Sequence, residues 1–341
     1  MSNKLPSIDI IIPTLNASHV LPSCLKSLST QNYPKSLLHL YIVDAGSTDN
    51  TLSLARKYGA QILKNPLHTG EAGKAVGLKL AKSDLVFFLD SDNILPDPNW
   101  LTTMTSPFLT HPQIFCTEPI AFTYRPNAGF IERYCALLGA NDPYAWFSGI
   151  YDRYSTLDKT WTRLKLTSID HSQYVEVFPN INTPLPTIGA NGTLYRRPII
   201  QSVFKSDYLF DIDLIYKILK KHPSLTIAKV KTDIIHTYAE SSVLKFWRKQ
   251  FRRVRDYYQF SHLRLNHWSA VNITSAPLFG LYTMSLILPL FHSLKGFLRR
   301  PDLAWFFHLP ACLLTLLAYA LVVIMKFFGI NPSQSRLKWS Q

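Results

Sequence analysis

The sequence predicts an α/β fold: an open, mostly parallel sheet flanked by helices, with apolar helices near the C-terminus. Three observations predict it. Short β-branched runs alternate with segments of helical spacing over the first hundred residues. The run at residues 85–89 is wholly apolar, as expected for the buried centre of a parallel sheet. Two runs without a charged side chain, residues 270–291 and 303–325, are each long enough to cross a hydrocarbon core of about 30 Å as a helix.

The first half of the chain alternates predicted strands with predicted helices. The strands are expected at residues 8–13, 40–43, 60–63 and 85–89. The helices between them are expected at residues 20–28, 51–58 and 71–81. Repeated units of this kind form a doubly wound sheet, whose ligands bind beyond the carboxyl ends of the strands.

The middle of the chain, residues 96–235, gives weaker patterns and is rich in aromatic and turn residues. Its charged stretch at residues 151–165 is expected to be exposed. Further elements are expected as a helix at residues 212–219, a strand at 225–230 and a basic helix at 243–258.

Composition narrows the class of protein. The chain has 341 residues, of which 47% are apolar and 17% charged, so a disordered chain is excluded and about two domains are expected. Residues 217–264 contain twelve Lys and Arg against three Asp and Glu, which is nine of the net +14 charges. Because this basic segment directly precedes the uncharged runs, it predicts contact with anionic membrane lipids on the cytoplasmic side, and no nucleic acid. The four scattered cysteines predict reduced thiols.

The two apolar runs leave three arrangements open. They can form two membrane-spanning helices, a re-entrant or interfacial hairpin, or two buried helices of a soluble core. The connecting residues 292–302 carry three basic side chains, which disfavours their placement outside the cell.

Asp90-Ser91-Asp92 follows the apolar strand at residues 85–89. Alternate residues of an extended segment point the same way, so the two carboxylates can share one ligand. Paired carboxylates at a sheet edge suit a hard divalent cation that also binds phosphate oxygens. The structural alternative is a simple turn built on Asp92 and Asn93.

Two further polar segments follow strands or open helices at the same edge. Asp44 begins Asp-Ala-Gly-Ser-Thr-Asp, where a carboxylate can accept hydrogen bonds from a base or ribose. Helix capping by Ser47 or Asp49 is an alternative that is compatible with this role. At residues 70–74, Gly-Glu-Ala-Gly-Lys opens a helix, so its glycines allow close approach of a ligand and Lys74 can pair with a diphosphate.

Four motifs, in order, resemble those of family 2 glycosyltransferases with the GT-A fold. They are Ile-Pro-Thr-Leu-Asn at residues 12–16, Val-Asp-Ala-Gly-Ser-Thr-Asp at 43–49, the segment at 70–77, and Asp90-Ser91-Asp92. The resemblance implies an inverting transfer of a sugar from a nucleoside-diphosphate sugar, with a divalent cation, Mn²⁺ or Mg²⁺. Ala45 stands where the family often has a second Asp, which leaves the base of the nucleotide open.

The same resemblance implies which residues form the donor site. Those expected to bind the nucleotide sugar are Pro13, Thr14, Asn16, Asp44, Gly70, Lys74, Asp90 and Ser91. Those expected to hold the cation are Asp90, Asp92 and His236, since the family frequently has a metal-ligating His at that position. A lone His is also common as a structural residue, so both interpretations of His236 stay open.

The second half resembles the family more loosely. Gly189-Ala190-Asn191-Gly192 resembles the acceptor-side loop, which makes Asn191 a candidate acceptor contact. Phe210-Asp211-Ile212-Asp213 resembles the segment that often reads Glu-Asp and supplies the catalytic base. Asp211 is the first candidate and Asp213 the second, and both can instead be ordinary first-turn residues of a helix.

A last segment, Gln250-Phe251-Arg252-Arg253-Val254, resembles the Gln-x-x-Arg-Trp motif of processive members. Val254 replaces the Trp, which argues against polymer synthesis. Arg252 and Arg253 are candidates for contact with the acceptor or a lipid phosphate, or for the solvated face of a basic helix.

Together these patterns predict a glycosyltransferase anchored in a plasma or inner membrane, with its catalytic domain in the cytoplasm. Its expected acceptor is membrane-associated, a polyprenyl-phosphate-linked glycan or a lipid. Residues 1–264 are the predicted catalytic domain, with a nucleotide-sugar half at 1–125 and an acceptor half at 126–264, and residues 265–341 are the anchor. The alternatives are a nucleotidyltransferase on a related sheet and a non-enzymatic basic membrane protein.

Overall fold

The computed structural model describes residues 4–189, 191–259 and 269–330. They pack as two compact units, one of Met1–Ile120 with Lys165–His236 and one of Ala121–Leu164 with Thr237–Ser335. The predicted domain boundary at residue 264 and the tail at 331–341 lie outside the described residues. These units differ from the predicted division, because Ala121–Leu164 belongs to the same unit as the C-terminal helices.

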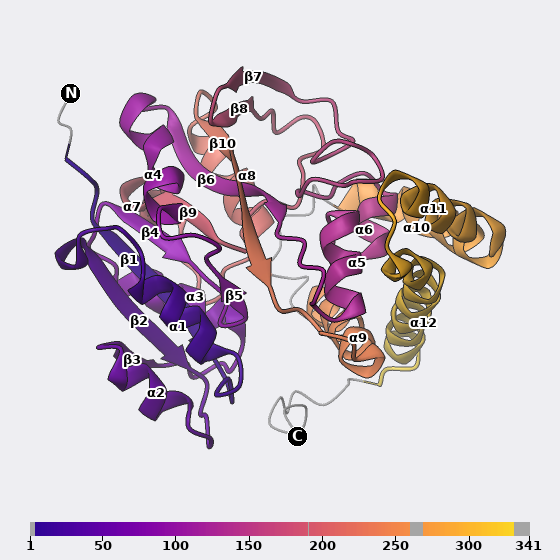
Figure 1. The fold of residues 1–341 in the computed structure, drawn as a ribbon, viewed down its shortest axis with the longest axis horizontal. Helices are drawn as coiled ribbons and strands as arrows, with labels where there is room; N and C mark the ends of the chain where they lie inside the picture. Colours follow the sequence, from indigo (N-terminus) through magenta and orange to yellow (C-terminus); the bar gives the residue numbers. More distant parts are fainter. Residues whose placement is uncertain (1–3, 190, 260–268, 331–341) are drawn as a thin grey trace. The chain divides into compact units, whose positions relative to one another are not determined.

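The first unit is built on one mixed, mostly parallel sheet, as the sequence predicts. Its strands in the described residues are β1 (Ile8–Thr14), β2 (Leu38–Asp44), β3 (Gln61–Lys64), β4 (Leu85–Phe88), β5 (Asn93–Ile94), β6 (Ile114–Phe122), β7 (Thr167–His171), β8 (Tyr174–Phe178), β9 (Thr193–Arg196) and β10 (Thr226–His236). Their order is β3-β2-β1-β4-β9-β6-β10-β8-β7, and β5 pairs with β10. The first four strands are parallel to one another, and β9 runs antiparallel to both β4 and β6 (Figure 1).

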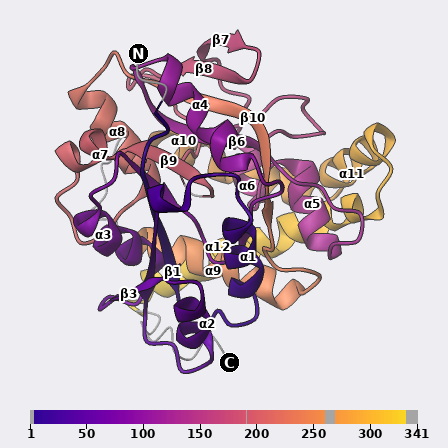
Figure 2. The same ribbon diagram turned by 60° about the vertical axis from the view of Figure 1, so that its left-hand side comes forward.

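Helices flank this sheet. They are α1 (Leu21–Ser29), α2 (Thr51–Lys57), α3 (Gly70–Leu80), α4 (Trp100–Thr110), α7 (Arg197–Val203) and α8 (Asp211–Lys221), with a short 3₁₀ turn at Lys35–Leu37. Figure 2 shows α1 and α3 on opposite sides of β1. The strands and helices predicted for the first half are therefore confirmed, because their apolar spacing and turn residues agree along the chain.

Two glycines of α3 lie close to β1. A Cβ on Gly77 would lie 2.5 Å from Ile11 Cγ2, and one on Gly73 would lie 2.9 Å from Pro13 Cβ. Gly73 and Gly77 therefore let α3 pack closely against β1. Thr69 caps the helix by accepting a hydrogen bond from the Ala72 N–H at 3.0 Å.

The second unit is helical. Its elements are α5 (Phe130–Leu138), α6 (Pro143–Phe147), α9 (Val243–Gln259), α10 (Ser269–Met284), α11 (Ile287–Arg299), a 3₁₀ turn at Leu303–Phe307 and α12 (His308–Phe327). α12 packs against α6, α9, α10 and α11. Its core includes Trp146, Phe246 and Trp305, all buried.

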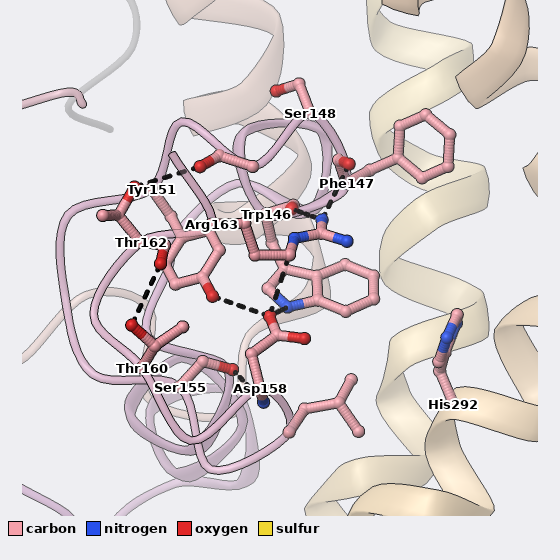
Figure 3. A network of polar contacts seen from close by, with 12 residues as sticks. Trp146, Phe147, Ser148, Tyr151, Ser155, Asp158, Thr160, Thr162, Arg163 and His292 are labelled. Atoms are coloured by element: carbon pink, nitrogen blue, oxygen red, sulfur yellow. Dashed lines mark hydrogen bonds and ion pairs between the residues drawn. The ribbon is translucent and has the colours of Figure 1, made fainter. Parts of the chain in front are cut away.

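Only four residues of the stretch at residues 151–165 are exposed, so the prediction that the stretch is exposed is wrong. Asp158 Oδ2 accepts hydrogen bonds from Trp146 Nε1 and the Tyr151 hydroxyl, each at 2.7 Å (Figure 3). The Arg163 guanidinium lies over the Trp146 ring, 4.9 Å from its centroid. Tyr151 and Arg153 are almost completely buried. Two ion pairs form within this stretch, Arg153 with Asp152 and Arg163 with Asp158, which composition alone does not reveal.

The first apolar run does not form the single helix expected over residues 270–291. α10 ends at Met284, and α11 begins at Ile287 and continues to Arg299, bent by 82° from α10. Pro289 lies in the first turn of α11, where a missing N–H breaks no intrahelical bond. A new helix therefore begins there, and most of residues 292–302, expected as a connecting loop, is helical.

The second apolar run is confirmed as a continuous helical segment. Among the described residues, Leu303–Phe327 is the helix that is long and apolar enough to cross a membrane, judged by length and composition. α10 and α11 reach the same criterion only together, as a bent pair.

Candidate active site

The loops after β1 and β2 are held together at the carboxyl end of the sheet. Thr14 and Asp44 are paired in the strand register, and the Thr14 hydroxyl donates to Asp44 Oδ1 over 2.9 Å. Asp44 Oδ2 accepts from the N–H groups of Gly46 and Ser47 at 2.9 and 2.8 Å. Ser47 Oγ accepts from the Asn16 N–H at 2.8 Å. The buried Asp44 carboxylate thus fixes the two loops in which the nucleoside-binding residues are predicted.

Two of the three candidate cation ligands, Asp92 and His236, lie side by side where β10 ends. β10 pairs with β5 so that His236 lies opposite Asn93, which directly follows Asp92. His236 Nε2 lies 3.4 Å from Asp92 Oδ2. Burial raises the pKa of Asp90, Lys74 opposes that rise, and the charge of Asp92 adds to it. Two carboxylates that repel each other beside an imidazole nitrogen fit a Mn²⁺ or Mg²⁺ ion by the chemistry of the donor set.

Lys74 connects this group to α8. Its Nζ lies 3.3 Å from both carboxylate oxygens of Asp211, and the side chain is 5% exposed. The negative charges of Asp211 and Asp90 raise the pKa of Lys74 against the effect of its burial. A buried ammonium group therefore lies between a predicted cation ligand and the predicted base. Lys74 is expected from the sequence to pair with a diphosphate, and its pairing with Asp211 is not foreseen there.

Asp211 and Asp213 have different surroundings although both lie in the first turn of α8. Burial raises the pKa of Asp211 to about 7, although Lys74 lowers it. A carboxyl group that titrates near neutral pH suits general-base catalysis. Asp213 is 3% exposed. Of the two, Asp211 is the residue that contacts Lys74.

The predicted acceptor-side loop lies against Asp211. Gly189 has a φ of +125°, and a Cβ there would lie 2.7 Å from Asp211 Cβ and 2.8 Å from the Tyr195 hydroxyl. The Gly189 N–H donates to Glu118 Oε1 at 3.0 Å, and Lys229 Nζ donates to Glu118 Oε2 at 2.6 Å. This fully buried ion pair anchors the start of the loop. Asn191 follows in the same loop, and Ala190 lies outside the described residues.

Arg252 and Arg253 lie on α9, in the second unit. Arg253 Nη1 lies 3.1 Å from Asp142 Oδ2 and donates to Gln250 Oε1 at 2.7 Å. The Tyr319 hydroxyl of α12 also donates to Asp142, at 2.5 Å. Arg253 is thus part of a polar network that joins α9 to α12, although its side chain, like that of Arg252, is exposed. Their contact with a phosphate or an acceptor stays a prediction.

Two residues near the site are missed by the sequence analysis. Glu71, in the first turn of α3, accepts a hydrogen bond from the Tyr208 hydroxyl at 3.2 Å and is one of the charges that raise the pKa of Asp211. His68 has a φ of 55°, and its Nδ1 lies 2.5 Å from the Ala45 carbonyl oxygen, beside the loop after β2. The signal for Glu71 is its place next to the glycine that opens the helix, whereas nothing in the pattern points to His68.

The Gly189→Ala variant is expected to lose about 10²-fold in transfer rate, because the added methyl group must displace Asp211 or Tyr195, and a shift of about 1 Å at a catalytic group has an effect of this size. Steady-state kinetics of the purified variant measure the loss. Gly59→Ala is the control, since Gly59 also has a positive φ of 73° but no described atom within 4 Å of an added Cβ. Equal activity of the two variants would contradict a close fit of this loop against Asp211.

Comparison with known proteins assigns the chain to a protein family. Residues 9–204, more than half of the chain, match the sequence model of the family described as glycosyl transferase family 2. The glycosyltransferase AglE of Haloferax volcanii is 29% identical over 141 residues, which cover 39% of this chain and 46% of AglE. The uncharacterized glycosyltransferase YibD of Escherichia coli is 32% identical over 110 residues, which cover 31% of each protein. The matched stretch thus spans less than half the length of these relatives.

Solved structures agree with the predicted fold. The mannosyltransferase PcManGT from Pyrobaculum calidifontis, solved in complex with GDP-Man and Mn²⁺, superimposes with a TM-score of 0.50 at 15% sequence identity. The superposition covers 99% of this chain and 86% of PcManGT. The GT-A fold expected from the sequence is therefore confirmed. On the extent of the sequence match, the chain belongs to glycosyl transferase family 2.

Proposed function

We propose that this protein transfers a sugar from a nucleoside-diphosphate sugar to an acceptor hydroxyl, with inversion at the anomeric carbon. One observation carries the proposal: the buried Lys74–Asp211 pair lies next to the group of Asp90, Asp92 and His236 at the carboxyl edge of the sheet. A candidate base and a candidate cation site thus occur together at the edge where open α/β sheets bind their ligands.

The donor would be bound by the loops after β1 and β2. Asp44 uses both carboxylate oxygens to hold the two loops, so it shapes the nucleoside site as much as it contacts the nucleoside. Pro13, Thr14 and Asn16 supply the wall on the β1 side. Gly70 begins α3, where the helix N-terminus favours the negative charge of a diphosphate.

A divalent cation would be held by Asp90, Asp92 and His236, and when bound it would neutralise the charge of the leaving diphosphate. The support for it is the chemistry of this donor set, together with the Mn²⁺ in the complex of PcManGT. Lys74 places a second positive charge beside Asp90. Asp211 accepts the proton of the attacking hydroxyl, and Lys74 favours the ionised form of its carboxylate and orients it.

The test of this function is a panel of UDP-, GDP- and dTDP-sugars offered with Mn²⁺ or Mg²⁺ and a membrane lipid extract. We expect release of the nucleoside diphosphate from one donor, accelerated by the extract. In a parallel assay with nucleoside triphosphates and sugar 1-phosphates, release of inorganic diphosphate would identify a nucleotidyltransferase instead. No turnover with any nucleotide sugar would contradict the proposed function.

We further propose that the second unit contacts the cytoplasmic membrane surface and that the acceptor is a lipid-linked glycan or lipid. Among the described residues, twenty of the 29 exposed large hydrophobic side chains lie between residues 278 and 330. They include Leu281 at 71%, Ile287 at 75% and Leu298 at 74% exposure. Soluble proteins rarely expose so much apolar surface in one region. The basic α9 would add attraction to anionic headgroups.

A variant with Leu281→Glu, Ile287→Glu and Leu298→Glu is expected to bind liposomes at least tenfold less, because each buried leucine or isoleucine contributes roughly 1.5–3 kcal/mol. Flotation with phosphatidylglycerol-containing liposomes measures it. The control is Ile169→Glu with Phe178→Glu, two exposed positions on the hairpin β7–β8. Unchanged flotation of the triple variant would rule out α10 and α11 as the membrane contact.

A further inference from the structure

A second cluster of metal-ligating side chains lies away from the donor site. His111 follows α4, and His171 and Glu176 come from the two strands of the hairpin β7–β8. The three residues each offer a ligand atom, and these atoms all lie within 4.8 Å of one another. The two imidazole rings have centroids 4.9 Å apart.

This cluster is separate from the proposed cation site. Glu176 Oε1 accepts from the Thr226 hydroxyl at 2.7 Å, and Thr226 begins β10, the 11-residue strand that ends at His236. An extended strand rises about 3.3 Å per residue, so the two places are roughly 33 Å apart. One ion cannot serve both.

The carboxylate of the cluster is built into the protein. Glu176 is 2% exposed, and its Oε1 is fixed by Thr226 and by Gln113 Nε2 at 2.9 Å. Its Oε2 lies 3.1 Å from His171 Nε2. A buried carboxylate with one oxygen fixed by two donors and the other facing an imidazole is ready to bind a cation.

The imidazole of His111 is also held by outer partners. Its Nδ1 lies 2.5 Å from the Tyr174 hydroxyl and 2.9 Å from Thr110 Oγ1, and either oxygen can accept the Nδ1 proton. The ring of Tyr174 stacks on His171 with centroids 4.6 Å apart. Metal-ligating histidines are commonly oriented in this way, because a hydrogen bond at one ring nitrogen fixes the tautomer that presents a lone pair at the other.

We propose that His111, His171 and Glu176 bind a zinc-type divalent transition metal ion that fastens the hairpin β7–β8 to the end of α4. Two imidazoles and one carboxylate are a ligand set of zinc sites that keep a water in the fourth position. The hairpin lies at the edge of the sheet, so an ion here links its two strands to a helix that is distant in the sequence. The ion would stabilise the first unit and take no part in sugar transfer.

The test uses the full chain with Asp90→Asn and Asp92→Asn, which weakens the donor site. Co²⁺ titration is expected to give one site per chain with visible absorption bands of a nitrogen-and-oxygen ligand set, and Zn²⁺ is expected to displace Co²⁺ and raise the Tm. Adding His111→Gln and His171→Gln is expected to weaken binding at least 100-fold. His19→Gln, at an exposed position, is the control and should change nothing.

A second measurement needs no substitution in the cluster. In the unaltered chain, Zn²⁺ is expected to protect His111 and His171 from diethyl pyrocarbonate, as read by mass spectrometry, while His19 stays reactive. Equal modification with and without Zn²⁺, or Co²⁺ binding that is unaffected by the two His substitutions, would overturn the proposal.

Discussion

The Asp92→Asn variant is expected to lose about 10²–10³-fold in nucleoside diphosphate release, the range seen when one electrostatic contact to a developing negative charge is removed. The reason is that Asp92 lies 3.4 Å from His236 and its charge raises the pKa of Asp90. Its carboxylate therefore interacts with both of the other proposed cation ligands. Asparagine keeps the shape and removes the charge. Kinetics at saturating Mn²⁺ and saturating donor measure the loss.

Cation binding itself gives a readout that does not depend on turnover. In the unaltered protein, Mn²⁺ with nucleoside diphosphate is expected to raise the Tm more than either alone, because each improves the binding of the other. In Asp92→Asn this extra rise should disappear. The control is Asp97→Asn, because Asp97 is an exposed carboxylate a few residues further along the same segment, where it accepts from the Asn99 N–H. A normal rise in the Asp92 variant would place the cation elsewhere.

The contrast between the predicted and the observed site has a physical origin. Asp44, Asp90 and Asp92 are predictable because each follows a strand, and parallel strands bring their carboxyl ends to one edge. The Lys74–Asp211 pair joins two helices 137 residues apart in sequence, and no local pattern records such a contact. The ion pair of Glu118 and Lys229 cannot be predicted for the same reason, because the two residues lie in different strands, far apart in the sequence.

In the fold, too, the features set by local spacing are predictable, whereas those set by contacts between distant residues are not. The apolar spacing of the first half fixes β1 to β4 and α1 to α3 because the alternation of strand and helix is repeated. The run at residues 270–291 has no charged side chain, so its hydropathy alone does not mark the bend near Leu286. The charged stretch at residues 151–165 is partly buried because Asp158 and Arg163 contact Trp146, which lies outside it.

The Asp211→Asn variant is expected to lose about 10²–10⁴-fold in transfer, the usual contribution of a general base, with little change in donor binding. The reason is that Asp211 is the carboxylate held by Lys74, beside the acceptor-side Gly189. Asp207→Asn is a matched control, since Asp207 pairs with Lys79 of the same helix α3 but at the protein surface. Exposed pairs of this kind contribute only about 0–1 kcal/mol.

The pH dependence separates a base from a purely structural carboxylate. A base works in its ionised form, and burial raises the pKa of Asp211 to about 7. kcat/KM is therefore expected to fall tenfold per pH unit below a midpoint at or under 7, because a bound cation would offset the Asp90 charge that contributes to the raised pKa. Asp211→Asn should remove this limb, whereas Asp207→Asn should keep it. An unchanged acidic limb in Asp211→Asn would transfer the role of base to another group, with Asp213 the next to test.

The raised pKa of Asp211 also makes the stability of the protein depend on pH, and this dependence can be measured without substrate. Because the folded protein holds the Asp211 proton more tightly than the unfolded chain, this group's contribution to stability is complete below about pH 4 and is lost as pH rises through about 7. Unfolding by urea at pH 5 and pH 8 is expected to show a smaller loss of stability in Asp211→Asn than in the unaltered protein. An identical loss in both would mean that Asp211 is ionised across this range, and the acidic limb of the activity would then have to arise elsewhere.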